Sequence, residues 1–135
     1  MPEFTVETRS REEFIEITEE VSGLVRASGI ESGICVVYIP HTTAGVMINE
    51  NADPSVQADV RELLIRFAPP NAAYRHIEGN ADAHAKAVLT GSSVSLIVEK
   101  GLLHLGRWQG IYFCEFDGPR TRRVLVKTVR GSVSA

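Results

Sequence analysis

The sequence lacks the features that mark several large classes of protein. It has only two cysteines, Cys35 and Cys114, which lie in apolar runs without CxxC spacing, so we expect buried thiols and no cysteine metal site. No stretch approaches the roughly 20 apolar residues of a membrane span, and the first residues do not resemble a signal peptide. The 14 basic and 17 acidic residues form no long block of one sign, which argues against nucleic-acid or membrane binding. We therefore expect a protein of the reducing cytoplasm.

Length and hydrophobic pattern predict one domain, residues 1–135, that contains both strands and helices. The chain has 135 residues, of which 44% are hydrophobic, enough for one ordinary core. We expect the strand over 33–39 to be buried on both faces, and the strands of the C-terminal third to form an antiparallel meander. The predicted strands cover 4–8, 33–39, 46–49, 94–98, 102–105, 110–116 and 122–129, and the predicted helices run from Arg11 to Gly29, from Asp53 to Pro69 and over 81–89.

The end of the predicted strand over 33–39 delivers polar side chains to one place. Pro40 breaks the apolar run and is followed directly by His41, Thr42 and Thr43. Such a density of polar groups exceeds what a small core requires. We interpret this loop as part of a ligand-binding or active site.

Three histidines lie at or beside the ends of predicted elements, which suggests a metal site. Neutral imidazoles of His41, His76 and His84 together would bind a divalent ion such as zinc and leave an open position for water or substrate. Their spacing matches no compact motif such as HExxH. The alternative is that each histidine only makes local hydrogen bonds, His41 near Thr42 and Thr43, and His84 to a carbonyl. We place His104 on the surface.

Carboxylates, amides and an arginine supply further candidates. Glu50 lies between a strand and a helix, where it could act as a general base or orient a histidine. Asn80 caps the predicted helix over 81–89 and shares a face with His84, whereas Asp82 points elsewhere. Arg120 offers a planar donor fork for phosphate, or alternatively pairs with Asp117 within the turn.

The run Gly106-Arg107-Trp108-Gln109-Gly110 also permits two interpretations. Trp108 is either a plug in the core or in an interface, or part of a pocket wall with the Gln109 amide. The candidate substrate-binding residues are Thr42, Thr43, Asn80, Gln109 and Arg120, and the candidate catalytic residues are His41, Glu50, Asp82 and His84.

Five motifs in order resemble the YjbQ family: Pro40-His41-Thr42-Thr43-Ala44, Asn49-Glu50-Asn51-Ala52-Asp53-Pro54, Asn80-Ala81-Asp82-Ala83-His84, Gly106-Arg107-Trp108-Gln109 and Glu115-Phe116-Asp117-Gly118-Pro119-Arg120. The resemblance covers about residues 4–127. It implies an α+β fold, an antiparallel β-sandwich with two to three packed helices, assembled as a homotrimer with polar clefts near subunit contacts. Arg107 departs from the family pattern, in which a Gly-Thr-Trp-Gln run is more usual.

The resemblance also implies a secondary thiamine-phosphate synthase activity, which joins a pyrimidine methyl pyrophosphate to a thiazole phosphate and releases pyrophosphate. It carries a site role to His41, His76, His84, Glu50, Asp82 and Arg120. We therefore expect a cytoplasmic enzyme that acts on a phosphorylated small molecule. The sequence has no Gly-rich phosphate loop and no aspartate pair for magnesium pyrophosphate. Two alternatives are a metal-dependent hydrolase and a non-catalytic trimer that binds a metabolite or anion.

Overall fold

The computed structural model describes residues 2–132, and this part of the chain folds into two antiparallel sheets with three helices. The larger sheet has the strand order β1-β8-β3-β5-β6, and the smaller sheet has the order β2-β7-β4. The predicted α+β class is confirmed. The elements are β1 (Glu3–Glu7), β2 (Glu13–Glu16), α1 (Thr18–Ser28), β3 (Gly33–Tyr38), β4 (Ala44–Glu50), α2 (Pro54–Phe67), α3 (Ala81–Thr90), β5 (Ser93–Glu99), β6 (Leu102–Leu103), β7 (Gln109–Glu115) and β8 (Thr121–Arg130).

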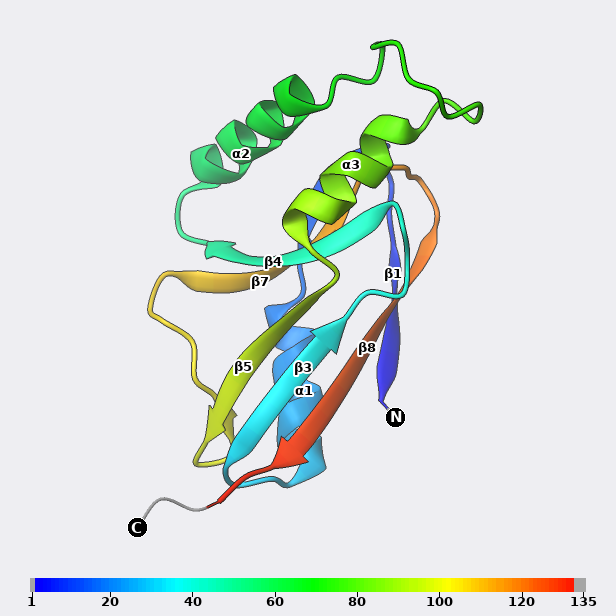
Figure 1. Cartoon of the computed structure of the whole chain (residues 1–135). Coiled ribbons are helices and arrows are strands. Elements are labelled where there is room, and N and C mark those ends of the chain that lie inside the picture. Colours follow the sequence, from blue (N-terminus) through cyan, green and yellow to red (C-terminus); the bar gives the residue numbers. More distant parts are fainter. Residues whose placement is uncertain (1, 133–135) are drawn as a thin grey trace.

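The two sheets and α1 share the main hydrophobic core. Helix α1 lies against the inner face of the larger sheet, as Figure 1 shows, and buries Val21 and Val25 there. Strand β7 uses the two-residue period of a strand to serve two cores. Ile111 and Phe113 enter the main core, whereas Cys114 joins a second cluster under α2 and α3. The smaller sheet is therefore covered on both faces.

The outer face of the larger sheet remains uncovered by the described elements, which corrects the prediction for 33–39. Strand β3 does lie centrally, between β5 and β8. Its burial nevertheless alternates, because only the inner face meets a second layer. Cys35 and Val37 are fully buried, whereas Ile34 and Tyr38 on the outer face are 49% and 46% exposed.

The predicted helix from Arg11 was wrong at its start. Glu13–Glu16 form strand β2, and α1 begins only at Thr18. The Glu13 carboxylate does accept hydrogen bonds from the backbone N–H groups of Arg9 and Ser10, as in a capping box. Pairing with β7 across Glu13–Glu16 then imposes an extended backbone, so a tertiary contact overrides the local signal.

The predicted C-terminal meander was also wrong. Strands β5 and β6 form a hairpin, but β7 crosses to the smaller sheet and β8 returns to pair with β3 and β1. The second predicted helix is confirmed as α2, with Pro54 in its first turn and the Asp53 carboxylate accepting from the Ser55 N–H at 2.9 Å. Within residues 2–132 every helix is too short or too polar to cross a bilayer.

Candidate functional site

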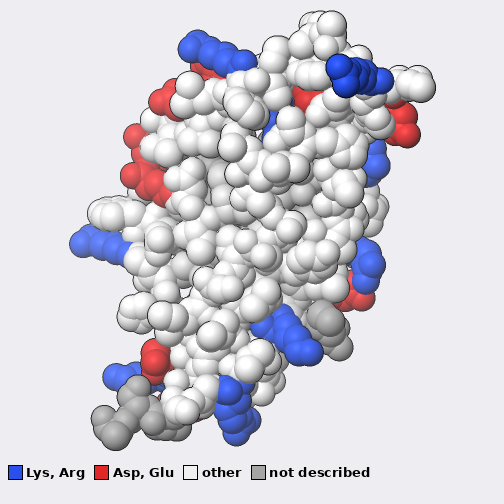
Figure 2. Space-filling model, in the orientation of Figure 1, with Lys and Arg blue, Asp and Glu red and all other residues white. Residues whose placement is uncertain are grey.

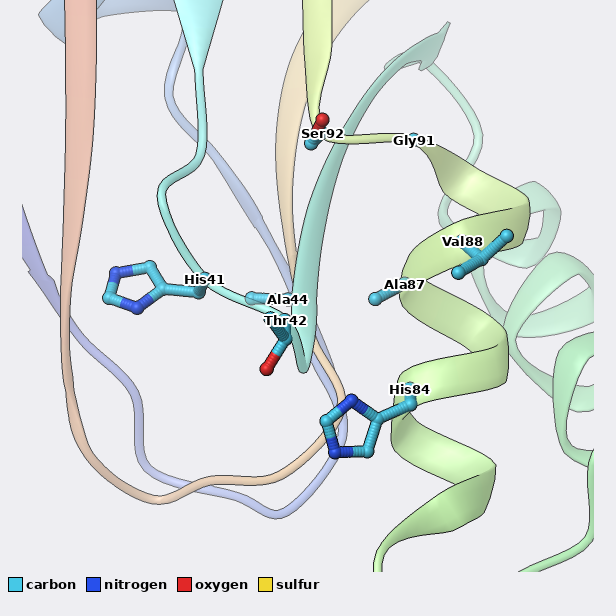
Figure 3. A pocket seen from close by; sticks show the side chains of 8 residues that line it. All are labelled: His41, Thr42, Ala44, His84, Ala87, Val88, Gly91 and Ser92. Atoms are coloured by element: carbon cyan, nitrogen blue, oxygen red, sulfur yellow. The ribbon is translucent and has the colours of Figure 1, made fainter.

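The loop between β3 and β4 forms the floor of a cleft beside α3 (Figure 3). It is fastened on both sides to the segment after α3, since Ile39 N–H donates to the Ser92 carbonyl at 2.8 Å and Val46 N–H to the Gly91 carbonyl at 3.0 Å. The cleft has a volume of about 380 Å³. It is lined by His41, Thr42, Ala44, His84, Ala87, Val88, Gly91 and Ser92.

Gly45 allows this close approach between β4 and the end of α3. A Cβ atom at this position would lie 2.2 Å from Thr90 Oγ1 and 2.6 Å from the Gly91 carbonyl oxygen. Any larger residue would push α3 away from the sheet. The glycine therefore sets the width of the cleft.

A second, more polar cleft adjoins the first. Its volume is about 530 Å³, and it shares His41, Thr42 and Ser92 with the first cleft. The hydroxyl groups of Thr42 and Ser92 belong to exposed residues. The lining residues are Tyr38, Ile39, Pro40, His41, Thr42, Thr43, Ser92, Arg120 and Arg122.

His41 stands where the two clefts meet, and its ring points toward β8 (Figure 3). Its Nε2 accepts a hydrogen bond from the backbone N–H of Arg123 at 2.8 Å, so the neutral ring carries its proton on Nδ1. The partner is thus β8 and not the region of Thr42 and Thr43, as the local alternative supposed. Burial lowers the pKa of His41, and the charges of Arg122, Arg123 and Arg120 lower it further against the opposing charge of Glu115.

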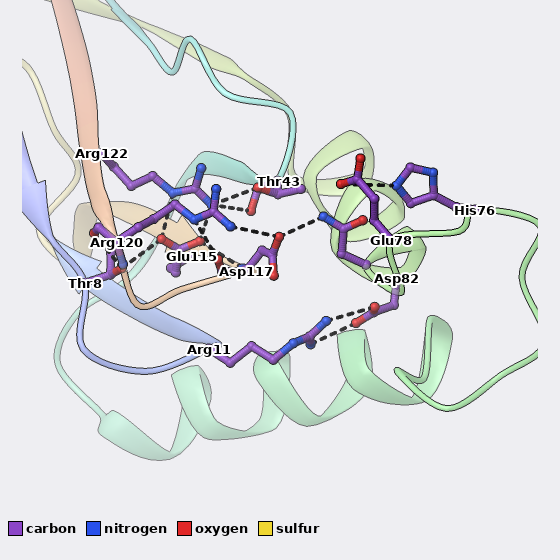
Figure 4. A network of polar contacts seen from close by, with 11 residues as sticks. Thr8, Arg11, Thr43, His76, Glu78, Asp82, Glu115, Asp117, Arg120 and Arg122 are labelled. Atoms are coloured by element: carbon purple, nitrogen blue, oxygen red, sulfur yellow. Dashed lines mark hydrogen bonds and ion pairs between the residues drawn. The ribbon is translucent and has the colours of Figure 1, made fainter.

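A buried ion pair lies under the polar cleft (Figure 4). Arg122 donates from Nε to Glu115 Oε2 at 2.7 Å and from Nη2 to Glu115 Oε1, and Nη2 also donates to Thr43 Oγ1 at 2.8 Å. Glu115 is 0% and Arg122 2% exposed. Glu115 further accepts from the Thr8 hydroxyl and the Asp117 N–H, both at 2.9 Å. This full set of donors offsets the cost of burying both charges.

Asp117 connects the polar cleft to the start of α3. Its carboxylate accepts from Arg120 Nη2 at 3.1 Å and from Asn80 Nδ2 at 2.8 Å. The predicted pair of Asp117 and Arg120 is confirmed. Asn80 is the residue before α3, but its side chain makes no capping bond: Nδ2 donates to Asp117, and the buried Oδ1 accepts no hydrogen bond from the described residues. The Arg120 side chain is 51% exposed and can also reach a ligand.

A second ionic cluster, formed by Arg11, Glu12, Asp82 and Lys86, connects α3 to the segment before β2. Arg11 makes two bonds of 3.0 Å to the Asp82 carboxylate, and Lys86 Nζ bonds Asp82 at 3.0 Å and Glu12. Burial opposes ionisation of Asp82, but the bonds from Arg11 and Lys86 outweigh it and hold the pKa of this carboxyl below its usual value. Asp82 is fully buried and faces away from the cleft, so the geometry assigns it to holding α3 and not to the reacting centre.

The three histidines are only partly brought together. His76 and His84 stack edge to face with ring centroids 5.3 Å apart, and His84 shares the first cleft with His41. His76 lies 3.9 Å from Glu78 and does not line that cleft. Within residues 2–132, no group of three or more His, Cys, Asp or Glu side chains is placed to hold a metal ion. Within one chain, the described residues therefore do not bring the three imidazoles together at one point.

Glu50 and Gln109 lie away from His41. They face each other across the end of β4 and β7. Since a strand rises about 3.4 Å per residue, Glu50 lies roughly 20 Å along β4 from Ala44, which adjoins the His41 loop. Glu50 accepts from the Asp53 N–H at 3.3 Å, and Gln109 Oε1 accepts from the Gly106 N–H at 2.7 Å. One chain therefore presents two separate polar clusters.

Sequence reasoning missed Arg11, Lys86, Arg122 and Ser92. Arg122 did carry a signal, because it alternates with the apolar residues Val124 and Val126 on the inward face of β8. Lys86 follows Asp82 by four residues, the spacing of an ion pair on a helix. Ser92 is polar and exposed, and its sequence surroundings carry no comparable signal.

Comparison with known proteins defines the family. The family model described as "UPF0047 protein YjbQ-like" matches residues 2–131. The chain is 50% identical over 123 residues to the UPF0047 protein YugU of Bacillus subtilis, covering 90% of this chain and 93% of that protein. The chain belongs to the YjbQ family. A UPF0047 protein of Methanocaldococcus jannaschii is 47% identical over 126 residues, covering 93% of this chain and 91% of that protein.

Solved structures of YjbQ family proteins share this fold. An uncharacterized YjbQ/UPF0047 protein of Clostridium acetobutylicum, 50% identical, matches with a TM-score of 0.94 over 96% of this chain and 100% of that chain. A YbjQ-like protein of unknown function from Sulfolobus solfataricus, 32% identical, matches with a TM-score of 0.93 over 96% of each chain. The resemblance and the fold it implied are confirmed.

Removing one partner of the buried pair should destabilise this YjbQ family protein. We expect Arg122→Met to lower the free energy of unfolding by about 3–5 kcal/mol, because Glu115 is left buried without its counter-charge. Chemical denaturation followed by circular dichroism measures the loss. The double variant Glu115→Gln/Arg122→Met removes both charges and should recover part of it. An Arg122→Met protein as stable as the wild type would contradict this account.

The lowered pKa of His41 predicts a pH dependence of stability. The pKa of His41 is lower in the folded protein than its ordinary value of 6.5, so near this pH the unfolded chain binds more protons than the folded protein does. The unfolding free energy should therefore fall as the pH drops through 6.5 toward the lower folded-state pKa. His41→Gln should lose less stability than the wild type between about pH 7 and about pH 5. The control is His104→Gln, at an exposed position, which should lose as much stability as the wild type. Equal losses of stability in the wild type and in His41→Gln would contradict the prediction.

Proposed function

We propose that this YjbQ family protein binds a phosphorylated small molecule in the two adjoining clefts and acts on it with His41 and His84. The observation that carries the proposal is the pairing of the clefts. One contains arginines and hydroxyl groups, and the other is walled in part by Ala44, Ala87 and Val88. Phosphate oxygens would lie on the polar side, and an organic ring would pack on the apolar side.

The polar cleft supplies donors suited to an anion. The half-exposed guanidinium of Arg120 can turn from Asp117 to a phosphate, and Asp117 then keeps the hydrogen bond from Asn80. Arg122 stays committed to Glu115, whose carboxylate largely cancels its charge, so Arg120 is the arginine that can bind the anion. The exposed hydroxyls of Thr42 and Ser92 supply neutral donors at the junction of the clefts.

His41 suits hydrogen-bond donation to a leaving oxygen. Its Nε2 is held by the Arg123 N–H, which fixes the ring and leaves the Nδ1 proton as the donor. His84 reaches the same cleft from α3 (Figure 3) and can hold or exchange a second proton. Two imidazoles beside one arginine fit departure of a phosphate or pyrophosphate group.

The secondary thiamine-phosphate synthase activity is the finer form of the proposal. The pyrophosphate of the pyrimidine substrate would lie near Arg120, with its ring against Ala87 and Val88. Catalysis would consist of holding the thiazole nitrogen in line and stabilising the departing pyrophosphate. The absence of a Gly-rich phosphate loop predicts slow turnover by this route.

A homotrimer in the cytoplasm also forms part of the proposal. The uncovered outer face of the larger sheet supports self-association, because Ile34, Tyr38, Ile97 and Val129 are all about half exposed on one sheet. Tyr38 also lines the polar cleft, so an interface over this face would reach the site.

Ligand binding and turnover test the proposed site. We expect pyrophosphate to bind wild-type protein in isothermal titration calorimetry, and Arg120→Ala to weaken it about tenfold or more through loss of the exposed donor fork. Turnover of the pyrimidine pyrophosphate and thiazole phosphate should fall about 100-fold in His41→Ala and in His84→Ala.

His104→Ala is the matched control, because His104 is exposed and lines neither cleft. Binding without turnover in the wild type would favour the non-catalytic anion-binding alternative. Unchanged binding in Arg120→Ala together with unchanged turnover in both histidine variants would refute the site.

A divalent metal held by His41, His76 and His84 stays a prediction. The close approach of the His76 and His84 rings favours this prediction. The hydrogen bond from the Arg123 N–H weighs against His41 as the third ligand, because it occupies the lone pair of Nε2. Metal analysis after purification without chelators should find about one zinc per chain if the prediction holds, and His76→Ala should abolish it. Metal-free protein that retains full turnover would exclude the ion and with it the metal-dependent hydrolase.

A further inference from the structure

One carboxylate oxygen of the turn after β7 accepts two donors from different parts of the molecule. Asp117 Oδ2 accepts from Arg120 Nη2 at 3.1 Å and from Asn80 Nδ2 at 2.8 Å. Arg120 lines the polar cleft, whereas Asn80 is the residue before α3. Neither Asn80 nor Asp117 lines the two clefts, so these two residues can influence a ligand there only through other groups.

The backbone of this turn is fixed, so only side chains can exchange partners there. The Asp117 N–H donates to Glu115 Oε1 at 2.9 Å. The Arg120 N–H donates to Thr8 Oγ1 at 2.9 Å, and the Arg120 carbonyl accepts from the Thr8 N–H at 3.0 Å. The Arg120 guanidinium, which also donates from Nε to the Asp117 carbonyl at 2.9 Å, is half exposed. It is therefore the mobile partner of Asp117.

Asn80 positions the first turn of α3 and with it His84. The Asn80 carbonyl accepts from the Ala83 N–H at 3.0 Å and from the His84 N–H at 3.3 Å. The side-chain amide donates from Nδ2 to Asp117, whereas its Oδ1 is buried and accepts no hydrogen bond from residues 2–132. A buried acceptor without a partner costs free energy. Among the hydrogen bonds of the described residues, the one to Asp117 therefore keeps this amide in place.

Two donors that share one carboxylate oxygen weaken each other, because each faces a charge that the other partly neutralises. The ion pair of Arg120 and Asp117 is exposed on the arginine side, and such pairs contribute little to stability, so an anion can displace it. Once Arg120 has turned to the anion, Asn80 keeps its hydrogen bond to Asp117 Oδ2. This bond to a carboxylate without its counter-charge should then be stronger and hold the first turn of α3 more firmly.

We propose that Asn80 and Asp117 are positioning residues that couple anion binding at Arg120 to the placement of His84. The coupling rests on the proposed function, which supplies the anion and the role of His84. Binding of the anion fixes His84 beside the first cleft. Because coupling between two sites is reciprocal, the bond from Asn80 to Asp117 in turn loosens Arg120 for the anion. Asn80 thus acts on the ligand without touching it.

A double-mutant cycle on pyrophosphate binding tests the coupling. We expect Asn80→Ala to weaken pyrophosphate binding about fivefold in isothermal titration calorimetry, because Asp117 then holds Arg120 more strongly. In an Arg120→Ala background the same change should have no effect, because the competing guanidinium is gone. A purely structural role of Asn80 would weaken binding equally in both backgrounds and would overturn the proposal, as would an unchanged affinity of Asn80→Ala.

The matched control is Asn71→Ala, at an exposed asparagine that lines neither cleft, and it should leave the affinity unchanged. Asn80→Ala should stay folded, because the Asn80 side chain makes no capping bond and the change also removes the unpartnered Oδ1. Circular dichroism checks the folding of each variant.

Nuclear magnetic resonance follows the coupling without any turnover. Ala83 lines neither cleft, and its N–H donates to the Asn80 carbonyl. We expect saturating pyrophosphate to shift the Ala83 amide signal in the wild type but not in Asn80→Ala. Equal shifts in both proteins, or no shift in the wild type when pyrophosphate is bound, would refute the link from Arg120 to α3.

Turnover separates the coupling from the proposed function. Asn80→Ala should lower kcat about tenfold, because His84 is then misplaced. In a His84→Ala background it should cause no further loss, because Asn80 acts on the reaction through His84.

Equal losses from Asn80→Ala in both backgrounds of an active protein would refute the positioning role and leave the proposed function standing. A wild type that binds pyrophosphate without turnover would refute the catalytic part of the proposed function, and the binding cycle would still decide the coupling. A wild type that does not bind pyrophosphate would refute the anion site and the coupling together.

Discussion

The buried pair of Glu115 and Arg122 holds together the parts of the molecule on which the candidate site depends. Glu115 ends β7 in the smaller sheet, and Arg122 lies on β8 in the larger sheet. Their two hydrogen bonds therefore cross between the sheets, and Arg122 extends the connection to Thr43 in the loop that carries His41. Charges at this depth are tolerated only because hydroxyl and backbone donors complete the set. The site is built at a point where both sheets and the loop are bonded to each other.

The two sheets differ in how many of their faces are covered by other described elements. The smaller sheet has the core on one face and α2 and α3 on the other, so its central strand β7 is buried from Gly110 to Glu115. The larger sheet covers only its inner face and leaves apolar side chains outside. Figure 2 shows charged residues mostly around the outline of this view, with a wide uncharged area between them.

Helix α3 is positioned by polar contacts as well as by the apolar packing of Ala83 and Ala87. Its first turns are bonded to Arg11 through Asp82 and to the turn after β7 through Asn80 and Asp117. Its last turn approaches β4 so closely that only Gly45 fits there. The helix is thus fixed at both ends, and His84 between them faces the cleft. Ionic contacts fix direction better than apolar ones, because donor and acceptor geometry is specific.

The sequence indicated several of the residues that line the two clefts, whereas their arrangement was not evident from it. Periodicity and turn residues predicted most strands, α2 and α3, and the polar run at His41 marked the cleft, because these signals are local. The strand at Glu13–Glu16, the crossing of β7 to the other sheet and the uncovered face of β3 depended on contacts distant in sequence, which local propensity does not encode. Likewise, histidine, glutamate and arginine could be named as reactive groups, but only the tertiary structure separated Glu50 from His41 and buried Asp82. The sequence determined which chemical groups are present and where the chain turns; the packing of the two sheets decided which of those groups meet, because distances between remote residues are set by the whole core and not by neighbours along the chain.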